Sequence, residues 1–251
     1  MEDITSPRVL RETLARYRLA PRKALGQNFL IDANLRKKIV AAAAPGPDDV
    51  VIEVGPGPGA LTAELLATGA AVLAVEADAG LARILSDRQP PVPGRFSIVV
   101  ADILRTDLPA LVSTAGFAGR PCMAVANLPY YITTPALFHL LEARLPWRRM
   151  VFLVQREVAQ RLAAAPGSKD YGLLSVMTQC RASVSVLTAL PPTVFWPPPK
   201  VHSALVRLEL PGPCRLSETE TARLAELARA AFGQRRKTIG NACRYWAERR
   251  G

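Results

Sequence analysis

Side chains that bind metals or form disulfides are scarce in this sequence of 251 residues, which has only 4 cysteines and 2 histidines. The cysteines (Cys122, Cys180, Cys214 and Cys243) lie far apart, and no Cys-x-x-Cys pair occurs. Zinc centres and disulfide-stapled folds depend on closely spaced ligands or bridges, so this spacing argues against both and favours reduced thiols. We therefore expect no metal site.

Long apolar runs are also missing, because no segment reaches the roughly 18 consecutive apolar residues that predict a membrane span. The first residues, Met1-Glu2-Asp3, lack the basic start and apolar stretch of a secretory signal. We expect a soluble cytoplasmic protein without membrane contact.

Acidic side chains are outnumbered, with 21 Asp and Glu against 32 Lys and Arg, and the formal charge is +11. Such an excess favours a polyanionic partner, because basic side chains that neutralise phosphates release condensed counterions. An Arg-rich genome is the alternative explanation of the charge.

What the sequence does contain is a regular alternation of short apolar runs and helical periods. Asp32 can cap a helix whose apolar residues recur at helical spacing. Strands separated by helices predict an α/β fold with a doubly wound, Rossmann-like, mostly parallel sheet. Alternating residues at 182–188 and 203–210 predict an antiparallel pair at its end, as in nucleoside methyltransferases. Parallel strands are predicted at 50–54, 71–76, 96–101, 122–126 and 150–154.

A glycine-rich turn follows the first predicted strand. Gly55-x-Gly57-x-x-Ala60, with Gly59 inside it, satisfies the dinucleotide fingerprint. Glycine permits the sharp turn and lets the backbone approach a ligand without a Cβ in the way. Glu76 ends the second strand 21 residues after Gly55. Its carboxylate can accept hydrogen bonds from both hydroxyls of a ribose.

Asp102 ends the third predicted strand, where its carboxylate can accept the amino hydrogens of a cofactor's adenine. The alternative is that Asp102 caps a short helix before Thr106. Together with the glycine turn, this residue predicts a cofactor that contains a nucleoside. It does not distinguish NAD from S-adenosylmethionine.

The motif Asn127-Leu128-Pro129-Tyr130 follows the fourth predicted strand, at the edge where open α/β sheets bind ligands. An adenine N6 amine is a poor nucleophile, because its lone pair is delocalised into the ring. The Asn127 side-chain oxygen and the Leu128 carbonyl can each accept one amine hydrogen and turn the lone pair toward a methyl donor. Pro129 stiffens the loop, and Tyr130 offers a stacking surface worth about 1–3 kcal/mol. The structural alternative is a plain Asn-x-Pro turn with a packed tyrosine.

These motifs and several others, in the same order, resemble the small-subunit (16S) ribosomal RNA adenine dimethyltransferase family from about residue 23 to residue 241. The resemblance implies S-adenosylmethionine as methyl donor and two adjacent adenosines as acceptors, in the 3′-terminal hairpin loop of ribosomal RNA within the pre-30S particle. Each would become N6,N6-dimethyladenosine. The further motifs are the segments 24–30, 171–176, 195–201 and 232–238.

The resemblance also assigns roles to individual residues. It implies that Phe195 sandwiches the target base against Tyr130, although an isolated Phe is more often part of a core. Gln27 and Asn28 suit a lid over the charged methionine moiety, with an ordinary loop as the alternative. The predicted cofactor contacts are Gln27, Asn28, Leu30, Gly55, Gly57, Gly59, Glu76, Asp102 and Asn127.

Pro211-Gly212-Pro213 divides the chain into two predicted regions. We expect residues 1–210 to form the S-adenosylmethionine-binding domain, with a helix and lid at 1–30. Residues 211–251 are expected to form a small helical RNA-binding domain, shorter than in relatives, that packs on the first. The whole is expected to be a monomer. The predicted RNA contacts are Arg22, Lys23, Lys200, Arg235, Arg236 and Lys237.

Three other functions share part of this pattern. A large-subunit adenine methyltransferase of the macrolide-resistance type shares the glycine turn and the amine clamp, the pair of acceptors formed by Asn127 and Leu128. Leu128 and the segment 171–176 nevertheless favour the small-subunit enzyme. A non-catalytic assembly factor would need neither the Gly55 turn nor Asn127. A nicotinamide dehydrogenase is disfavoured, because no residue has a role in hydride transfer.

Overall fold

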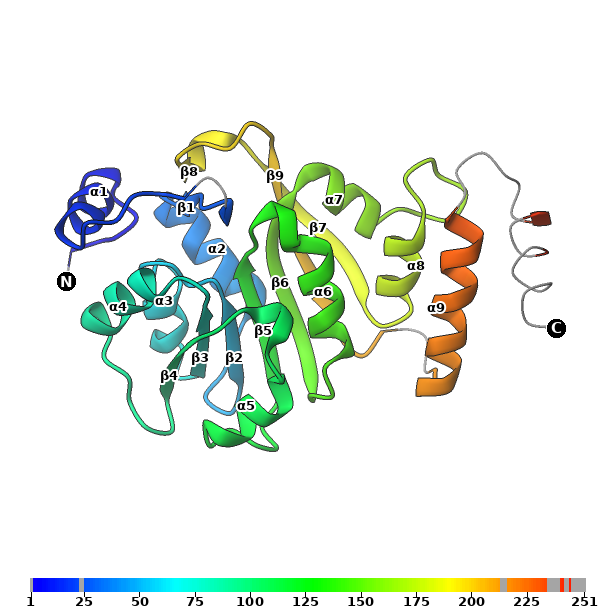
Figure 1. Ribbon diagram of the computed structural model, residues 1–251, viewed down its shortest axis with the longest axis horizontal. Coiled ribbons are helices and arrows are strands. Elements are labelled where there is room, and N and C mark those ends of the chain that lie inside the picture. The colour runs from blue at the N-terminus through cyan, green and yellow to red at the C-terminus, as the bar shows by residue number, and fades with distance from the viewer. Residues whose placement is uncertain (1, 23–24, 213–215, 234–239, 242–243, 245–251) are drawn as a thin grey trace.

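The computed structural model describes residues 2–22, 25–212, 216–233, 240–241 and 244. A twisted sheet runs through the centre of the molecule, and helices flank it (Figure 1). Its strands are β2 (Val50–Val54), β3 (Ala71–Glu76), β4 (Phe96–Val100), β5 (Cys122–Asn127), β6 (Trp147–Gln155), β7 (Ser183–Leu190) and β9 (Ser203–Glu209). The helices are α1 (Pro7–Arg16), α2 (Ala33–Ala43), α3 (Thr62–Ala67), α4 (Ala79–Arg88), α5 (Leu108–Thr114), α6 (Thr133–Glu142), α7 (Arg156–Leu162), α8 (Leu173–Gln179) and α9 (Glu218–Phe232).

The order of the strands across the sheet is β4-β3-β2-β5-β6-β9-β7. The strands from β4 to β6 pair in parallel, whereas β9 pairs antiparallel with both β6 and β7. This confirms the predicted Rossmann-like sheet, mostly parallel with an antiparallel strand near one end. The chain moves outward from β2 through β3 to β4 and then returns to β5 on the other side of β2. Such a reversal leaves a crevice at the carboxyl ends of the strands, where open α/β sheets bind ligands.

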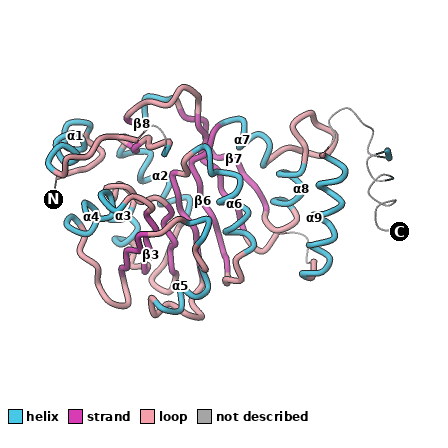
Figure 2. The backbone as a smooth tube through the Cα atoms, viewed as in Figure 1, coloured by secondary structure: helices cyan, strands magenta, loops and turns pink. Residues whose placement is uncertain are grey.

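Alternate residues of the central strands face two different helical layers. In β2, Val50 and Ile52 pack with residues of α5 and α6, whereas Val51 packs with residues of α2 and α3. The tube in Figure 2 shows the strands between these helices. Because both faces of the parallel strands are covered, those strands need apolar residues at nearly every position. Among the described residues, no helix is long and apolar enough to cross a membrane.

A second, two-stranded sheet joins two segments far apart in sequence, β1 (Phe29–Leu30) and β8 (Phe195–Trp196). Phe29 pairs with Trp196 and Leu30 with Phe195, in antiparallel register. The N-terminal lid segment is thereby fixed to the proline-rich connection between β7 and β9. Short turns of 3₁₀ helix also occur at η2 (Ile103–Arg105), η3 (Tyr130–Ile132) and η4 (Pro192–Val194).

Helix α9 lies at the end of the molecule where β7 borders the sheet (Figure 1). Ser217 and Glu220 form a capping box that begins the helix. Its Ala225 and Ala228 pack with Met177 of α8 in a small apolar cluster. In the described part of this region, the helix therefore contacts the main domain through a limited surface.

Candidate functional site

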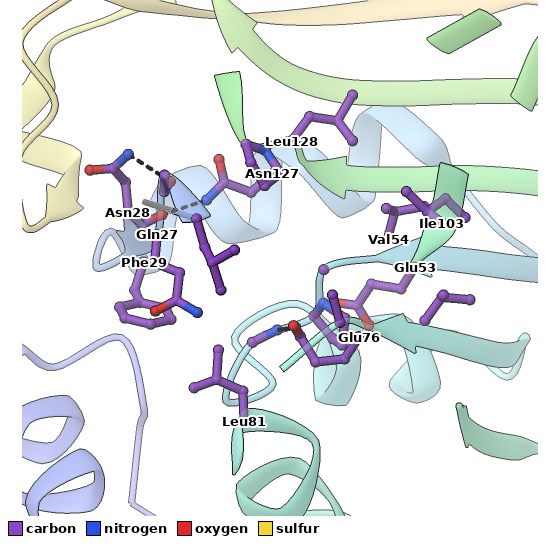
Figure 3. A pocket seen from close by; sticks show the side chains of 18 of the residues that line it. Gln27, Asn28, Phe29, Glu53, Val54, Glu76, Leu81, Ile103, Asn127 and Leu128 are labelled. Atoms are coloured by element: carbon purple, nitrogen blue, oxygen red, sulfur yellow. Dashed lines mark hydrogen bonds between the residues drawn. The ribbon is translucent and has the colours of Figure 1, made fainter. Parts of the chain in front are cut away.

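A cavity of about 330 Å³ lies at the carboxyl ends of β2, β3 and β5. It is bounded by residues 25–30 of the N-terminal lid, by the glycine turn after β2 and by the loop after β5. Figure 3 shows Asn127 close to Asn28, with Glu53 and Glu76 reaching in from the neighbouring strands. The predicted site residues that line it are Gln27, Asn28, Leu30, Gly55, Gly57, Glu76, Asp102, Asn127, Leu128, Pro129 and Tyr130.

The glycine turn has the conformation that its sequence predicts. Gly55 has a φ of +64°, and a Cβ built there would meet nothing within 4 Å. Because Gly55 also lines the cavity, its bare backbone can approach a ligand. Gly59 was predicted to contact the cofactor but does not line the cavity; a Cβ on it would lie 2.7 Å from Leu85 Cδ1 of α4. Its role is close packing of the turn against that helix.

Glu76 is held at the end of β3 by two backbone donors. The amides of Gly57 and Asp78 each donate to one of its carboxylate oxygens, both at 2.9 Å. The side chain is buried, and burial raises its pKa, while these two hydrogen bonds act in the opposite direction. The carboxylate is thus fixed at the cavity wall, with lone pairs remaining to accept from a ligand.

Glu53 is a second acidic residue of the cavity, and no motif in the sequence singles it out. It lies next to the carboxyl end of β2, is 1% exposed, and accepts a hydrogen bond of 2.7 Å from Thr62 Oγ1. Burial is the main cause that raises its pKa to about 8, and the charge of Glu76 acts in the same direction. An acid within an otherwise apolar strand is the sequence signal that could have revealed it.

Asp102 lines the cavity, and its carboxylate also accepts a hydrogen bond of 3.0 Å from the Leu104 amide at the start of η2. The side chain is about half exposed and lies 3.8 Å from the Arg105 guanidinium. The capping role considered from the sequence therefore exists. The second carboxylate oxygen, Oδ2, accepts no hydrogen bond from the described residues and is the one that lies near Arg105.

The Asn127 side chain is oriented by the lid. Its Nδ2 donates to the backbone carbonyl of Asn28 at 2.7 Å. Because the Asn28 carbonyl can only accept, the side-chain atom that faces it must be the amide nitrogen. The amide oxygen Oδ1 is then available to accept a hydrogen bond. The clamp hypothesis requires that same acceptor. The Asn28 side chain is held in turn, since its Nδ2 donates to Gly26 O at 3.0 Å.

The rest of the motif is anchored on both sides. The Leu128 amide donates to Leu153 O of β6 at 3.3 Å, and the Leu128 side chain is 1% exposed. Pro129 O accepts from Thr133 Oγ1 at 3.2 Å, which joins the loop to the start of α6. The loop can therefore present its backbone in one fixed conformation.

Tyr130 is attached to the antiparallel part of the sheet. Its hydroxyl lies 2.7 Å from Oγ of Ser203, the first residue of β9, which is fully buried. Burial raises the pKa of Tyr130. This hydrogen bond fixes the ring at the cavity. No pattern in the sequence singles out Ser203 as the residue that holds Tyr130 in place.

Residues of the lid are held by Asp78 at the start of α4. Gln27 Nε2 lies 3.4 Å from Asp78 Oδ2, and the Arg22 guanidinium lies 3.4 Å from the same oxygen. Gln27 also accepts a hydrogen bond of 2.8 Å from the Arg22 amide. Arg22, predicted to bind RNA, is still 60% exposed. The lid is thus linked to the strand end that carries Glu76.

Phe195 does not have the open ring face that was predicted for it. It is 2% exposed and packs with Leu30, Leu190 and Leu205 in the core. The physical reason is the pairing of β8 with β1, which turns this side chain inward. It does not line the cavity, and a base cannot stack on it in this conformation.

The predicted RNA contacts are only partly described. Lys200 is exposed in the loop before β9. Lys23, Arg235, Arg236 and Lys237 lie outside the described residues. Within the described part of the chain, no three His, Cys, Asp or Glu side chains gather where they could hold a metal ion.

Comparisons with known proteins agree with this geometry. A family model described as "Ribosomal RNA adenine dimethylase" matches residues 18–250. The chain is 43% identical over 242 residues to "Ribosomal RNA small subunit methyltransferase A" of Bacillus cereus, which covers 96% of the chain and 82% of that relative. It is similar to the crystal structure of a dimethyladenosine transferase from Plasmodium falciparum, with a TM-score of 0.71, 25% identity, and coverage of 85% and 74% of the two chains. It is also similar to the 23S rRNA methyltransferase ErmE, with a TM-score of 0.70, 28% identity, and coverage of 87% and 84%.

Proposed function

The chain belongs to the ribosomal RNA adenine dimethylase family, and from that premise we propose that it methylates the N6 amines of two adjacent adenosines in the 3′-terminal hairpin loop of small-subunit ribosomal RNA. The methyl donor is S-adenosylmethionine. Each acceptor becomes N6,N6-dimethyladenosine, so the enzyme transfers four methyl groups to each subunit. It is a ribosomal RNA (adenine-N6,N6)-dimethyltransferase that acts during ribosome assembly.

The chemistry of the cavity fits this donor. The Glu76 carboxylate would accept from the ribose hydroxyls, and Asp102 from the amino group of the donor's adenine. The open backbone at Gly55 and the polar lid residues Gln27 and Asn28 would border the methionine part. When bound, S-adenosylmethionine supplies an electrophilic methyl group on a sulfonium.

The acceptor amine is activated by position rather than by a strong base. Asn127 Oδ1 accepts one amine hydrogen and the Leu128 carbonyl the other, so that the nitrogen's lone pair points away from both. As the nitrogen gains positive charge, these two oxygens stabilise it without reorganising, because the lid and β6 already hold them. The methylated nitrogen is acidic and loses its proton to water. Tyr130 stacks on the flipped base.

The single observation that carries this proposal is the hydrogen bond from Asn127 Nδ2 to Asn28 O. It leaves Oδ1 available as the acceptor that the proposed contact with the amine needs. With the amide rotated by half a turn, Oδ1 would meet the Asn28 carbonyl, a second acceptor, and the Nδ2 donor would meet the donor hydrogens of the amine.

Purified under-methylated small and large subunits, incubated with labelled donor, test the proposal. We expect N6,N6-dimethyladenosine in the small subunit. Asn127→Ala should bind RNA nearly as well as the wild type and lose about 10²–10³-fold in turnover, as for the loss of one preorganised polar group. Undiminished turnover in the variant would show that the clamp is misassigned.

The second candidate is methylation of large-subunit RNA, which the similarity to the 23S enzyme favours. Label confined to the large subunit in the same experiment would establish it and reject our assignment. A non-catalytic assembly factor would leave both subunits unlabelled while still binding pre-ribosomal RNA.

We further propose that the partner is ribosomal RNA within the pre-30S particle, and that the enzyme works in the cytoplasm as a monomer without a metal ion. The charge of +11 suits an RNA partner. Methyl transfer from a sulfonium needs no metal, so activity should persist in EDTA. The mass in solution, measured by light scattering, should be that of one chain.

A further inference from the structure

Tyr131 is an aromatic side chain that the clamp does not use. It is 60% exposed, the highest fraction among the large apolar side chains of the described residues, yet it lines the same cavity as its neighbour Tyr130. The hydroxyl of Tyr130 is bonded to Ser203. Among the described residues, no hydrogen bond holds the hydroxyl of Tyr131. The ring of Tyr131 is therefore an apolar surface left open at the cavity mouth.

The lid passes close to this ring. Gly26 of the lid has a φ of +58°, and a Cβ built on it would lie 3.5 Å from Tyr131 Cδ1 and 3.6 Å from Pro129 Cβ. The lid backbone thus passes beside the ring, and the missing side chain at Gly26 leaves room between them. Residues 130–132 form one turn of 3₁₀ helix, which sets the two consecutive tyrosines side by side in the chain. The Tyr130 residue is half-buried in the site, and Tyr131 is exposed at its mouth.

The substrate has a matching requirement, if the proposed function is correct. To bring its N6 amine to Asn127, the target adenosine must leave the base stack of the loop. The adjacent base then loses a stacking partner and exposes one face to water. RNA-binding proteins meet such splayed bases with aromatic rings, because every base offers a flat face.

We propose that Tyr131 is the stacking platform for the nucleotide adjacent to the target adenosine. Two consecutive tyrosines then hold two consecutive bases, with Tyr130 on the base being methylated and Tyr131 on its neighbour. The inference rests on the proposed function and deepens it, because it explains how one site holds the unstacked neighbour of the target adenosine.

The first test uses the affinity for under-methylated small subunits. Tyr131→Ala should weaken binding by about 5- to 150-fold, the range expected for one base–aromatic stack. Tyr131→Phe should bind as the wild type does, since it keeps the ring. Affinity for the donor should be unchanged in both variants, which would show that the cavity is intact. Val186→Ala, a change at an exposed apolar residue of β7 (45% exposed) away from the cavity, is the matched control and should bind normally.

The second test locates the base on which Tyr131 stacks. Small subunits are assembled with a synthetic 3′ segment that carries an abasic site immediately before or after the target adenosine. At one of these positions, loss of the base should weaken wild-type binding as much as Tyr131→Ala does, and the two losses combined should not exceed either one alone.

Additive losses, or normal binding by Tyr131→Ala, would overturn the assignment of Tyr131. This failure is distinct from failure of the proposed function, because the wild type would still dimethylate the unaltered small subunit. If the wild type leaves that subunit unmethylated, the proposed function itself is wrong.

Discussion

Replacing the buried carboxyl of Glu53 by an amide, in Glu53→Gln, is expected to stabilise the folded protein at neutral and alkaline pH. Glu53 is 1% exposed, and its pKa is raised from an ordinary value of 4.5 to about 8, mainly by burial. The hydrogen bond from Thr62 offsets only part of this effect. In the unfolded chain the same carboxyl is solvated and titrates near its ordinary value.

The sign and size of the effect follow from this difference. Between pH 4.5 and about 8 the folded state keeps a proton that the unfolded state has lost. Stability falls with rising pH wherever the folded state binds more protons. The stabilising contribution of the protonated Glu53 is therefore complete below pH 4.5 and is lost as the pH rises through about 8. At about 1.4 kcal/mol for each pH unit, the loss is at most about 5 kcal/mol, and relaxation around the charge reduces it to a few kcal/mol.

Urea unfolding of the wild type and of Glu53→Gln, without donor, at several pH values from about 5 to about 9 measures this effect. The free energy of unfolding of the variant, relative to the wild type, should rise by a few kcal/mol up to about pH 8 and level off above that pH. Titrating groups that do not interact with Glu53 cancel in the difference, whereas Glu76, whose charge acts on Glu53, adds to the slope. Glu12→Gln, at an exposed ion pair with Arg8, is the control and should change stability by less than about 0.5 kcal/mol without such a slope. A difference between wild type and Glu53→Gln that does not vary with pH would refute the reasoning.

Three further predictions concern the clamp, the lid and the RNA contact. Ser203→Ala and Tyr130→Phe should each reduce turnover, and a double-mutant cycle on the free energy of unfolding should show a coupling of about 0.5–1.5 kcal/mol; additive effects would mean that their hydrogen bond does not matter. Asp78→Asn keeps a residue that caps α4 but removes the charge facing Arg22, so donor affinity by calorimetry should fall about two- to fivefold, and an unchanged affinity would count against the lid contact. Replacing the basic residues at 235–237 by Ala should weaken RNA binding and flatten its salt dependence while donor affinity stays the same, and an unchanged salt slope would place the RNA contact elsewhere.

The parts of the fold that were predictable depend on neighbouring residues in the sequence. Strands β2 and β3 were found at 50–54 and 71–76 because parallel strands covered on both faces are nearly continuous apolar runs. The glycine turn, the helix cap of Asp32 and the Asn127 motif are also local patterns. Each of them lies where the sequence predicted.

The parts that were not predictable depend on which distant segments meet. Phe195 is buried because β8 pairs with β1, and neither two-residue strand has a pattern of its own. The bond from Tyr130 to Ser203 joins residues 73 positions apart. The apolar neighbours of Glu53 predict a buried strand, but they do not show that its side chain borders the ligand cavity. The orientation of Asn127 could not be known either, since its partner Asn28 is 99 positions away.

The central claim is that the Asn127 amide activates the acceptor amine. It is tested most directly by mass spectrometry of the nucleosides of small-subunit ribosomal RNA from three strains, which carry the wild-type gene, no gene, or the gene with Asn127→Ala. The account predicts two N6,N6-dimethyladenosines in the 3′-terminal hairpin of the first strain, none in the strain without the gene, and a strongly reduced level in the strain with Asn127→Ala. Dimethylated adenosines at full level in the strain with Asn127→Ala would contradict it, because the acceptor amine would then be activated without the amide that the lid holds in place.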